Sequence, residues 1–186
     1  VLSQNQPLPE PVVIGKGGRP IPNTVIENDV KGYVGQSKEP LDPQEDGMDF
    51  FESLECMLVQ INDAKAVSTR NGYNEVSVVA DGGEDAGIFS EEGVLVLREN
   101  DPNPERIMID DSFVMMPEIH VGAVFAEPLV GVVDYDYGNY RIQLLKKPVL
   151  AQNAPFVAAS ATGTEQDWHL AVATYNLENF SSLQDL

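Results

Sequence analysis

The change in residue spacing along residues 46–61 constrains the fold more than any other stretch of the sequence. Its first half carries apolar residues at spacings of three and four, the pattern of one helix face: Phe50, Phe51 and Leu54. Its second half alternates with a period of two, as a strand does, and one side of that strand carries Met57, Val59 and Ile61. Asp49 and Glu52 have the spacing of a capping box, which predicts a helix over residues 49–55. We expect a short helix that covers one end of a small β-barrel and passes directly into its wall.

The remainder of the chain consists of short apolar runs separated by turns. It contains 13 prolines and 15 glycines, and frequent turns are typical of all-β folds. The predicted strands cover residues 12–14, 75–80, 93–97, 106–110, 129–135 and 140–144. The last two form a predicted hairpin whose tyrosines provide either a base-stacking platform or cross-strand packing: Tyr135, Tyr137 and Tyr140. The sequence therefore predicts an all-β, mainly antiparallel barrel with one short helix.

The charge of the chain argues against direct binding of nucleic acid. Thirty acidic residues against eleven basic ones give a formal net charge of −19, which repels a phosphate backbone. The only local basic patch is small and comprises Arg141, Lys146 and Lys147. Such a surface suits a salty or calcium-containing exterior. No apolar run approaches the length of a membrane span, and we expect a monomer. The single Cys56 has no partner for an internal disulfide, and we expect its thiol to be buried.

Acidic loops are the candidate cation sites. Asp42, Asp46 and Gly47 match the first, fifth and sixth positions of a calcium loop, but Gln44 and Ser53 stand where further ligands belong. A solvated loop that caps the next helix is the interpretation that we favour over a calcium site. Three other clusters gather a cation only if their loops converge, and otherwise are solvated: Asp81/Glu84/Asp85, Glu99/Asp101 and Asp110/Asp111.

Four phrases of the sequence resemble secreted bacterial nucleases of the endonuclease/exonuclease/phosphatase family, which is related to pancreatic DNase. The segment DGMDFFESLECMLV, residues 46–59, is similar to a signature upstream of their catalytic domain, although Cys56 replaces the usual glycine. The hairpin at residues 130–140 and the opening phrase PLPEPVVI are also similar to these proteins. The segment LAVATYNLEN, residues 170–179, resembles the first strand of the catalytic domain.

The resemblance implies a modular secreted phosphodiesterase of which this chain is a piece. Its expected parts are an extended lead-in (1–23), an OB-like β-barrel (24–149), a linker (150–167) and the truncated first strand of an α/β DNase-I-like domain (168–186). Asn176 matches the asparagine at the metal–phosphate centre of the family. The resemblance also implies Mg²⁺ or Mn²⁺ in the downstream catalytic domain, which would be this barrel's partner in cis, and a nucleic acid or other phosphodiester as substrate. The other catalytic residues would lie beyond Leu186, so we expect the chain alone to be inactive.

Three functions are compatible with the sequence. The first is an accessory barrel of an extracellular, metal-dependent nuclease. The second is a calcium-stabilised extracellular adhesion or interaction module without enzymatic activity, which the acidic loops favour. The third, a self-contained hydrolase with paired carboxylates, is the weakest because no carboxylate pair stands out among the 30 acidic residues.

Overall fold

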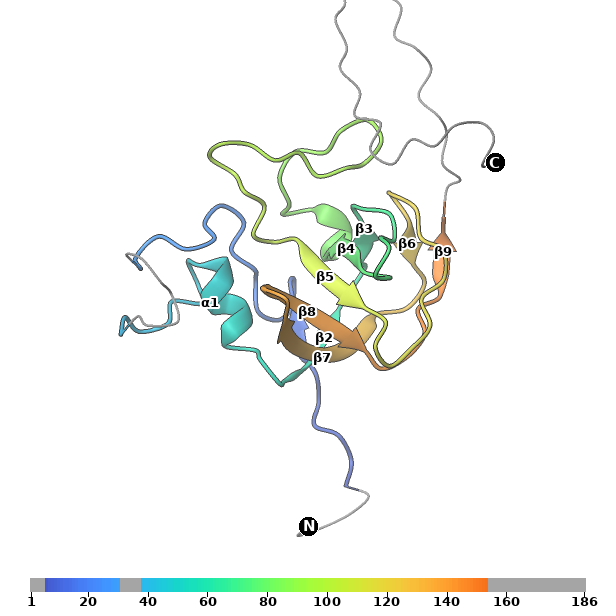
Figure 1. Ribbon diagram of the computed structural model, residues 1–186, viewed down its shortest axis with the longest axis horizontal. Helices are drawn as coiled ribbons and strands as arrows, with labels where there is room; N and C mark the ends of the chain where they lie inside the picture. The colour runs from blue at the N-terminus through green and yellow to red at the C-terminus, as the bar shows by residue number, and fades with distance from the viewer. Residues whose placement is uncertain (1–5, 31–37, 154–186) are drawn as a thin grey trace, which may run out of the picture. The chain divides into compact units, whose positions relative to one another are not determined.

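The computed structural model describes residues 6–30 and 38–153, which all belong to one compact unit, residues 1–156. These residues are built mainly from β-strands (Figure 1). The strands are β1 (Val12–Ile14), β2 (Leu58–Ile61), β3 (Lys65–Ala66), β4 (Val76–Val79), β5 (Ile107–Asp110), β6 (Val124–Phe125), β7 (Leu129–Asp136), β8 (Asn139–Leu144) and β9 (Leu150–Gln152). The helical elements are α1 (Gly47–Glu52) and the 3-10 turn η2 (Asp81–Gly83). No described helix is long and apolar enough to cross a bilayer.

The strands form one curled sheet in the order β1-β2-β7-β8-β5-β4-β3-β6-β9 (Figure 1). Six of the eight neighbouring pairs are antiparallel, whereas β1–β2 and β5–β8 are parallel. The curl gives a half-barrel, and the predicted all-β, barrel-like fold with one short helix is confirmed. The strand predicted at residues 12–14 lies at an edge of the sheet, because β1 has β2 as its only neighbour in the sheet of the described chain.

The hairpin β7–β8 forms the longest ladder and confirms the sequence prediction. Its two-residue turn places Tyr137 (φ 48°) and Gly138 (φ 78°) in left-handed conformations, as a type I′ turn requires. Within β7, a β-carbon on Gly131 would lie 2.5 Å from the carbonyl oxygen of Gln143. Gly131 therefore allows β8 to pack closely against its partner.

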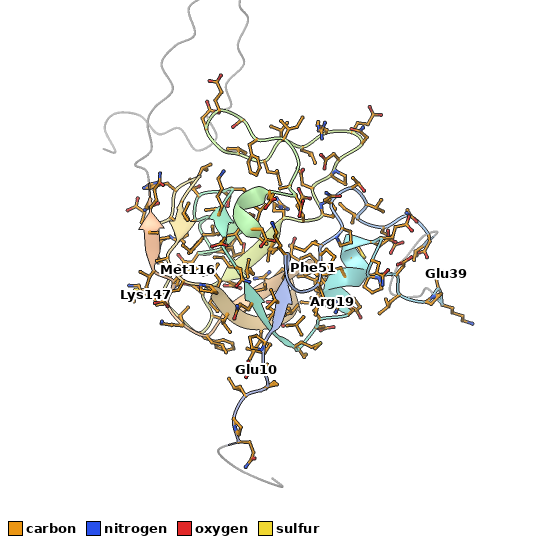
Figure 2. The ribbon with its side chains drawn as sticks, turned by 180° about the vertical axis from the view of Figure 1, so that it is seen from behind. Glu10, Arg19, Glu39, Phe51, Met116 and Lys147 are labelled. Atoms are coloured by element: carbon orange, nitrogen blue, oxygen red, sulfur yellow. The ribbon has the colours of Figure 1, made fainter. Side chains whose placement is uncertain are left out.

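Helix α1 begins and ends earlier than the capping-box pattern predicts. Its N-cap is Asp46, whose side chain makes no capping hydrogen bond. The predicted cap by the Asp49 side chain is therefore wrong. Instead, the Asp49 carboxylate accepts a hydrogen bond at 2.7 Å from the backbone N–H of Asp42. The guanidinium of Arg19 lies 5.2 Å from the centre of the Phe50 ring and donates to Ser53 Oγ at 2.8 Å, beside α1 in Figure 2. The helix is thus joined to the segment that follows β1.

Cys56 lies at the corner between α1 and β2, and the expectation that it is buried is wrong. It is exposed, with φ at 61°, and its backbone N–H donates to the Val133 carbonyl at 2.9 Å. The corner keeps the left-handed conformation that glycine adopts without strain, which points the cysteine side chain to solvent. Beyond it, Val59 and Ile61 are both fully buried, which agrees with their predicted place on one side of the strand. Met57, predicted on the same side, precedes β2 and is 41 % exposed.

One apolar cluster fills the interior of the sheet and receives α1. Figure 1 shows α1 beside the end of the sheet where β2, β7 and β8 lie. The largest fully buried side chains come from α1, the turn after it, most strands and one loop residue: Phe50, Leu54, Ile14, Val59, Ile61, Val76, Val78, Ile107, Ile109, Ile142, Leu144 and Ile119. Burying a side chain of this kind contributes about 1.5–3 kcal/mol, so the packing of α1 on this cluster positions the loops at its ends.

The strand predicted over residues 93–97 is wrong. Only Leu95 of this run is buried, Leu97 is 72 % exposed, and the sole ladder contact is an isolated bridge between Phe89 and Leu95. The run lies in the long loop between η2 and β5, where its backbone bonds residues 88 and 90 of the same loop and no strand of the sheet pairs with it. By contrast, β9 lies at the start of the predicted linker and pairs with β6, so the sheet extends past residue 149.

Two sequence predictions fall outside the described residues. These are the candidate site residue Asn176 and the strand at residues 168–186 in which it is expected to lie. The 154–167 part of the predicted linker also lies outside them.

Candidate metal centre

The N-terminal end of α1 brings carboxylates from two segments together. The backbone N–H groups of Gly47 and Met48 donate at 3.0 Å to the carbonyls of Val25 and Ile26. These bonds satisfy two of the free N–H groups at the start of the helix and hold residues 25–28 against it. Glu27, which follows directly in the chain, is thereby placed beside Asp46 and Asp49.

Glu27, Asp46 and Asp49 form a compact acidic group, which we call the α1 cluster. One carboxylate oxygen from each residue lies within 4.8 Å of the other two. Asp46 is 1 % exposed and Asp49 is 6 % exposed, whereas Glu27 is half-buried. This separation is short enough for a single cation to contact all three side chains, because calcium–oxygen distances are about 2.3–2.6 Å.

Two oxygens of the α1 cluster have no hydrogen-bond partner among the described residues. They are Glu27 Oε2 and Asp46 Oδ1, and both are inaccessible to solvent. The other oxygen of Asp46 accepts only a long bond of 3.5 Å from the backbone N–H of Asn28. A buried acceptor without a donor costs about 1–3 kcal/mol, and more when it is charged. The cluster therefore has free ligand atoms where a stable fold normally places donors.

No lysine or arginine in the described part of the chain forms an ion pair with the α1 cluster. Burial raises the pKa of Asp46 above its ordinary value, and the charges of Glu27 and Asp49 raise it further. Burial also acts to raise the pKa of Glu27, but N–H donors from Val30 and Asp29 outweigh it, so its pKa lies below the ordinary value. The result is a buried group in which negative charges face one another without a compensating cation from the protein.

The donor set of the α1 cluster fits a hard divalent cation. It consists entirely of carboxylate oxygens, which calcium and magnesium prefer, and it has no histidine or cysteine. Calcium accepts six to eight oxygens in irregular arrangements, so three carboxylates and solvent can satisfy it. Asp29 adds a further carboxylate nearby, hydrogen-bonded to Glu27, which raises the pKa of Asp29.

Of the two sequence candidates, Asp46 belongs to the α1 cluster and Asp42 does not. The Asp42 side chain is exposed, and the residue contacts the cluster through its backbone: its N–H donates to the Asp49 carboxylate, and its carbonyl accepts from the N–H of Asp46 at 3.0 Å. Glu27 was not predicted, since it lies in a loop far upstream and no sequence spacing links it to Asp46. Asp49 was interpreted as a cap. Its acidic character beside Asp46 was visible, but only the fold shows that it is buried.

The other predicted acidic clusters do not converge on a shared cation. Asp81 and Glu84 contact Lys16: Asp81 Oδ2 accepts its backbone N–H at 2.7 Å, and Glu84 pairs with its ammonium at 3.2 Å. Asp110 is buried in an ion pair with Arg141 at 2.9 Å. Asp101 is buried, whereas Glu99 is exposed.

A cavity of about 710 Å³ adjoins the α1 cluster and is lined by Asp49 and by aromatic side chains of α1, β7 and β8. The Tyr140 ring stacks on Phe51 at 6.0 Å and lies 4.8 Å from Tyr135, and its hydroxyl hydrogen-bonds the Glu52 carboxylate. Burial raises the pKa of Tyr140, and Glu52 raises it further. Tyr137, at the hairpin turn, is 89 % exposed. Tyr140 therefore packs as a cross-strand aromatic, while Tyr135 leaves a face open to the cavity.

The chain belongs to the family described as a domain of unknown function, DUF8508, whose model matches residues 13–154. The match covers every strand except the first residue of β1 and includes the whole α1 cluster. No curated protein and no solved structure matches the chain.

Proposed function

We propose that the barrel is a calcium-stabilised, non-catalytic accessory domain of a secreted, metal-dependent phosphodiesterase. The observation that carries the cation part is the α1 cluster, in which Asp46 is 1 % exposed and has a carboxylate oxygen without a partner. The link to a phosphodiesterase depends on the resemblance of residues 46–59, 130–140 and 170–179 to secreted nucleases.

Calcium suits the cluster better than magnesium. Magnesium requires nearly ideal octahedral geometry and keeps several waters, so it rarely binds in a pocket crowded by buried carboxylates. Extracellular calcium modules bind with dissociation constants of about 10⁻⁴–10⁻³ M, which matches a site with few rigid ligands. In such a site the cation joins residues 25–28 to α1 and compensates the buried charge.

A scaffold role for the barrel agrees with its charge. The net charge of −19 opposes the recruitment of a polyanion. Arg141, the centre of the small basic patch, is buried between Glu75 and Asp110, so its charge is neutralised within the fold. Nucleic acid would then be bound and cleaved by the downstream domain, with Asn176 at its metal–phosphate centre.

A second candidate is a calcium-stabilised interaction module without a catalytic partner. The cavity beside the α1 cluster favours it, because Tyr135 is 52 % exposed there and offers an aromatic surface to a ligand. The two candidates share the cation site and differ only in whether a longer form of the chain cleaves phosphodiesters.

The cation part is tested by thermal unfolding of the chelator-treated 186-residue chain. With 10 mM calcium we expect stabilisation of about 1.4–2.7 kcal/mol for dissociation constants of about 10⁻³–10⁻⁴ M, or a rise in Tm of roughly 3–10 °C. Magnesium at the same concentration should give a smaller rise. Equal unfolding temperatures in calcium and chelator would reject the cation site.

The phosphodiesterase part is tested by incubating linear and supercoiled DNA with the 186-residue chain in magnesium, manganese or calcium. We expect no chelator-sensitive cleavage by this chain and metal-dependent cleavage by a longer chain that includes the downstream domain. Asn176→Ala in the longer chain should reduce cleavage severely. A longer chain that leaves DNA and RNA intact would favour the interaction module.

A further inference from the structure

A second group of buried oxygens surrounds Gly87 in the long loop between η2 and β5. It comprises three alternate residues that end the loop: Asp101, Asn103 and Glu105. They are 5 %, 8 % and 5 % exposed, respectively. Polar side chains of this size are rarely so buried unless they are paired or bind a metal.

The three side chains converge on one backbone position. A β-carbon on Gly87 would lie 2.8 Å from Asp101 Oδ2 and 3.0 Å from Asn103 Oδ1. The backbone N–H of Gly87 donates to Glu105 Oε1 at 3.0 Å. Residue 87 must therefore be glycine for these oxygens to gather, and any side chain there would fill the space between them.

Each of the three side chains has one buried oxygen without a hydrogen-bond partner in the described chain. These atoms are Asp101 Oδ1, Asn103 Oδ1 and Glu105 Oε2. Arg98 pairs with the other oxygen of Asp101 at 2.5 Å, whereas no lysine or arginine among the described residues forms an ion pair with Glu105. Burial raises the pKa of Glu105, and the charge of Asp101 raises it further.

The local sequence limits the number of donors that the backbone can supply. Pro102 and Pro104 alternate with the three polar residues and have no N–H group. Asn103 has φ at 58°, a left-handed conformation that turns the chain and leaves its side chain inside the loop. The segment thus presents acceptor oxygens from alternate residues, with donors excluded between them.

We propose that Asp101, Asn103 and Glu105 form a second divalent-cation site, which binds calcium independently of the α1 cluster. Two carboxylates and an amide oxygen are hard ligands of the kind that calcium accepts in irregular geometry. A cation there cross-links residue 87 to residues 101–105, the two ends of a loop whose only ladder contacts are isolated bridges. Its binding would close the loop in place of regular secondary structure.

The second site lies close to the first in the fold, because Pro104 packs against the start of α1. A β-carbon on Gly47 would lie 2.6 Å from Pro104 Cβ. The two groups share no ligand residue, so single substitutions can separate them. Binding at both sites must therefore be measured in the same chain.

Calorimetric titration of calcium into the chelator-treated 186-residue chain tests the proposal. We expect two binding events in the wild type. Glu105→Gln keeps the acceptor for the Gly87 N–H but removes the charge, and Asn103→Gly keeps the left-handed backbone but removes the ligand oxygen. Each should weaken one event by roughly tenfold or more, because affinity follows ligand number and charge. The matched control Glu99→Gln loses the same charge from an exposed position of the same loop and should leave both events unchanged.

Asp46→Asn separates this proposal from the function proposed above. Loss of one event in Asp46→Asn and of the other in Glu105→Gln supports both sites. One event that disappears in Asp46→Asn but persists in Glu105→Gln and Asn103→Gly overturns the second site and leaves the first. A single event that persists in Asp46→Asn but disappears in Glu105→Gln and Asn103→Gly overturns the first site and leaves the second.

Limited proteolysis of the loop provides a readout that does not depend on heats of binding. Calcium should slow cleavage within residues 84–100 several-fold in the wild type and in Asp46→Asn, but not in Glu105→Gln. Circular dichroism confirms that each variant is folded before the comparison. Equal protection by calcium in the wild type and Glu105→Gln would overturn the proposal.

Discussion

Two buried acidic groups in this barrel differ in how their negative charge is compensated. Asp110, on β5, and the adjacent Glu75 receive hydrogen bonds from the Arg141 guanidinium at 2.9 and 2.8 Å. Burial acts to lower the pKa of Arg141, but its bond to Asp110 and the charge of Glu75 outweigh it, so the pKa lies above its ordinary value. The α1 cluster is buried to a similar degree, and no cationic side chain in the described chain pairs with it.

The contrast separates a group with its own counter-ion from one for which we propose a cation from solution. The carboxylates of the Arg141 group receive their donors from the protein: Gln143 also donates to Asp110, at 3.1 Å, and the Asp136 carbonyl accepts from Arg141 at 2.8 Å. The atoms without a partner in the described chain are Arg141 Nε and Gln143 Oε1, and neither of them carries a negative charge. This ion-pair network links β5 to β8 and supplies the positive charge for its carboxylates from within the chain. The α1 cluster lies outside the sheet, where a helix start and a loop meet, and its stability should follow the cation concentration.

The largest expected effect is the removal of the internal counter-ion. Arg141→Met retains the apolar stem but leaves Asp110 and Glu75 as uncompensated buried charges, which costs about 3–5 kcal/mol. Urea unfolding should show this loss equally in calcium and in chelator. If calcium restored the stability of Arg141→Met, the Arg141 group would also bind a cation, and the two acidic groups would not differ in this respect.

A moderate effect is expected in the pH dependence of the chelator-treated protein. The pKa of Asp46 is raised in the fold, so its protonation stabilises the native state: this contribution is complete below the ordinary value of 3.8 and is lost as pH rises through the folded value. Wild type should therefore gain stability relative to Asp46→Asn when pH is lowered from 7 toward 3.8. Urea unfolding of both proteins at several pH values measures the difference, and a constant difference would show that the Asp46 charge has no cost.

The smallest effect is expected from Asp42→Asn, which makes the same chemical change four residues from Asp46. The Asp42 side chain is exposed, and the contact with Asp49 uses its backbone N–H, which the substitution keeps. The free energy of unfolding should change by less than about 0.5 kcal/mol with or without calcium. Calcium-dependent destabilisation by Asp42→Asn, measured by urea unfolding, would extend the cation site into the loop and revise the assignment of its ligands.

The sequence predicted the sheet better than the acidic groups, for a physical reason. Alternation with period two records which side of a strand is buried, so β4, β5 and the β7–β8 hairpin could be located. The run at residues 93–97 has a similar composition but no neighbouring strand, and strand formation depends on that non-local partner. Cys56 illustrates the converse case, since its apolar neighbours suggested burial while the left-handed corner exposes it.

The candidate site was visible only in part. Asp46 could be selected because its loop matches some positions of a calcium loop, and the same match wrongly included Asp42. Glu27 joins the cluster through hydrogen bonds from α1 to the carbonyls of Val25 and Ile26, and such backbone bonds leave no signal in side-chain identity. Burial of Asp46 arises from the packing of the whole fold, which local spacing does not encode.

The central claim is that a cation supplies the charge which the α1 cluster lacks, and urea unfolding of wild type and Asp46→Asn tests it most directly. In chelator, Asp46→Asn should be at least as stable as wild type, because it removes a buried, unpaired charge. In 10 mM calcium the order should reverse, since wild type gains about 1.4–2.7 kcal/mol at the α1 cluster and the variant does not. The same order of stability in chelator and in calcium would contradict the claim.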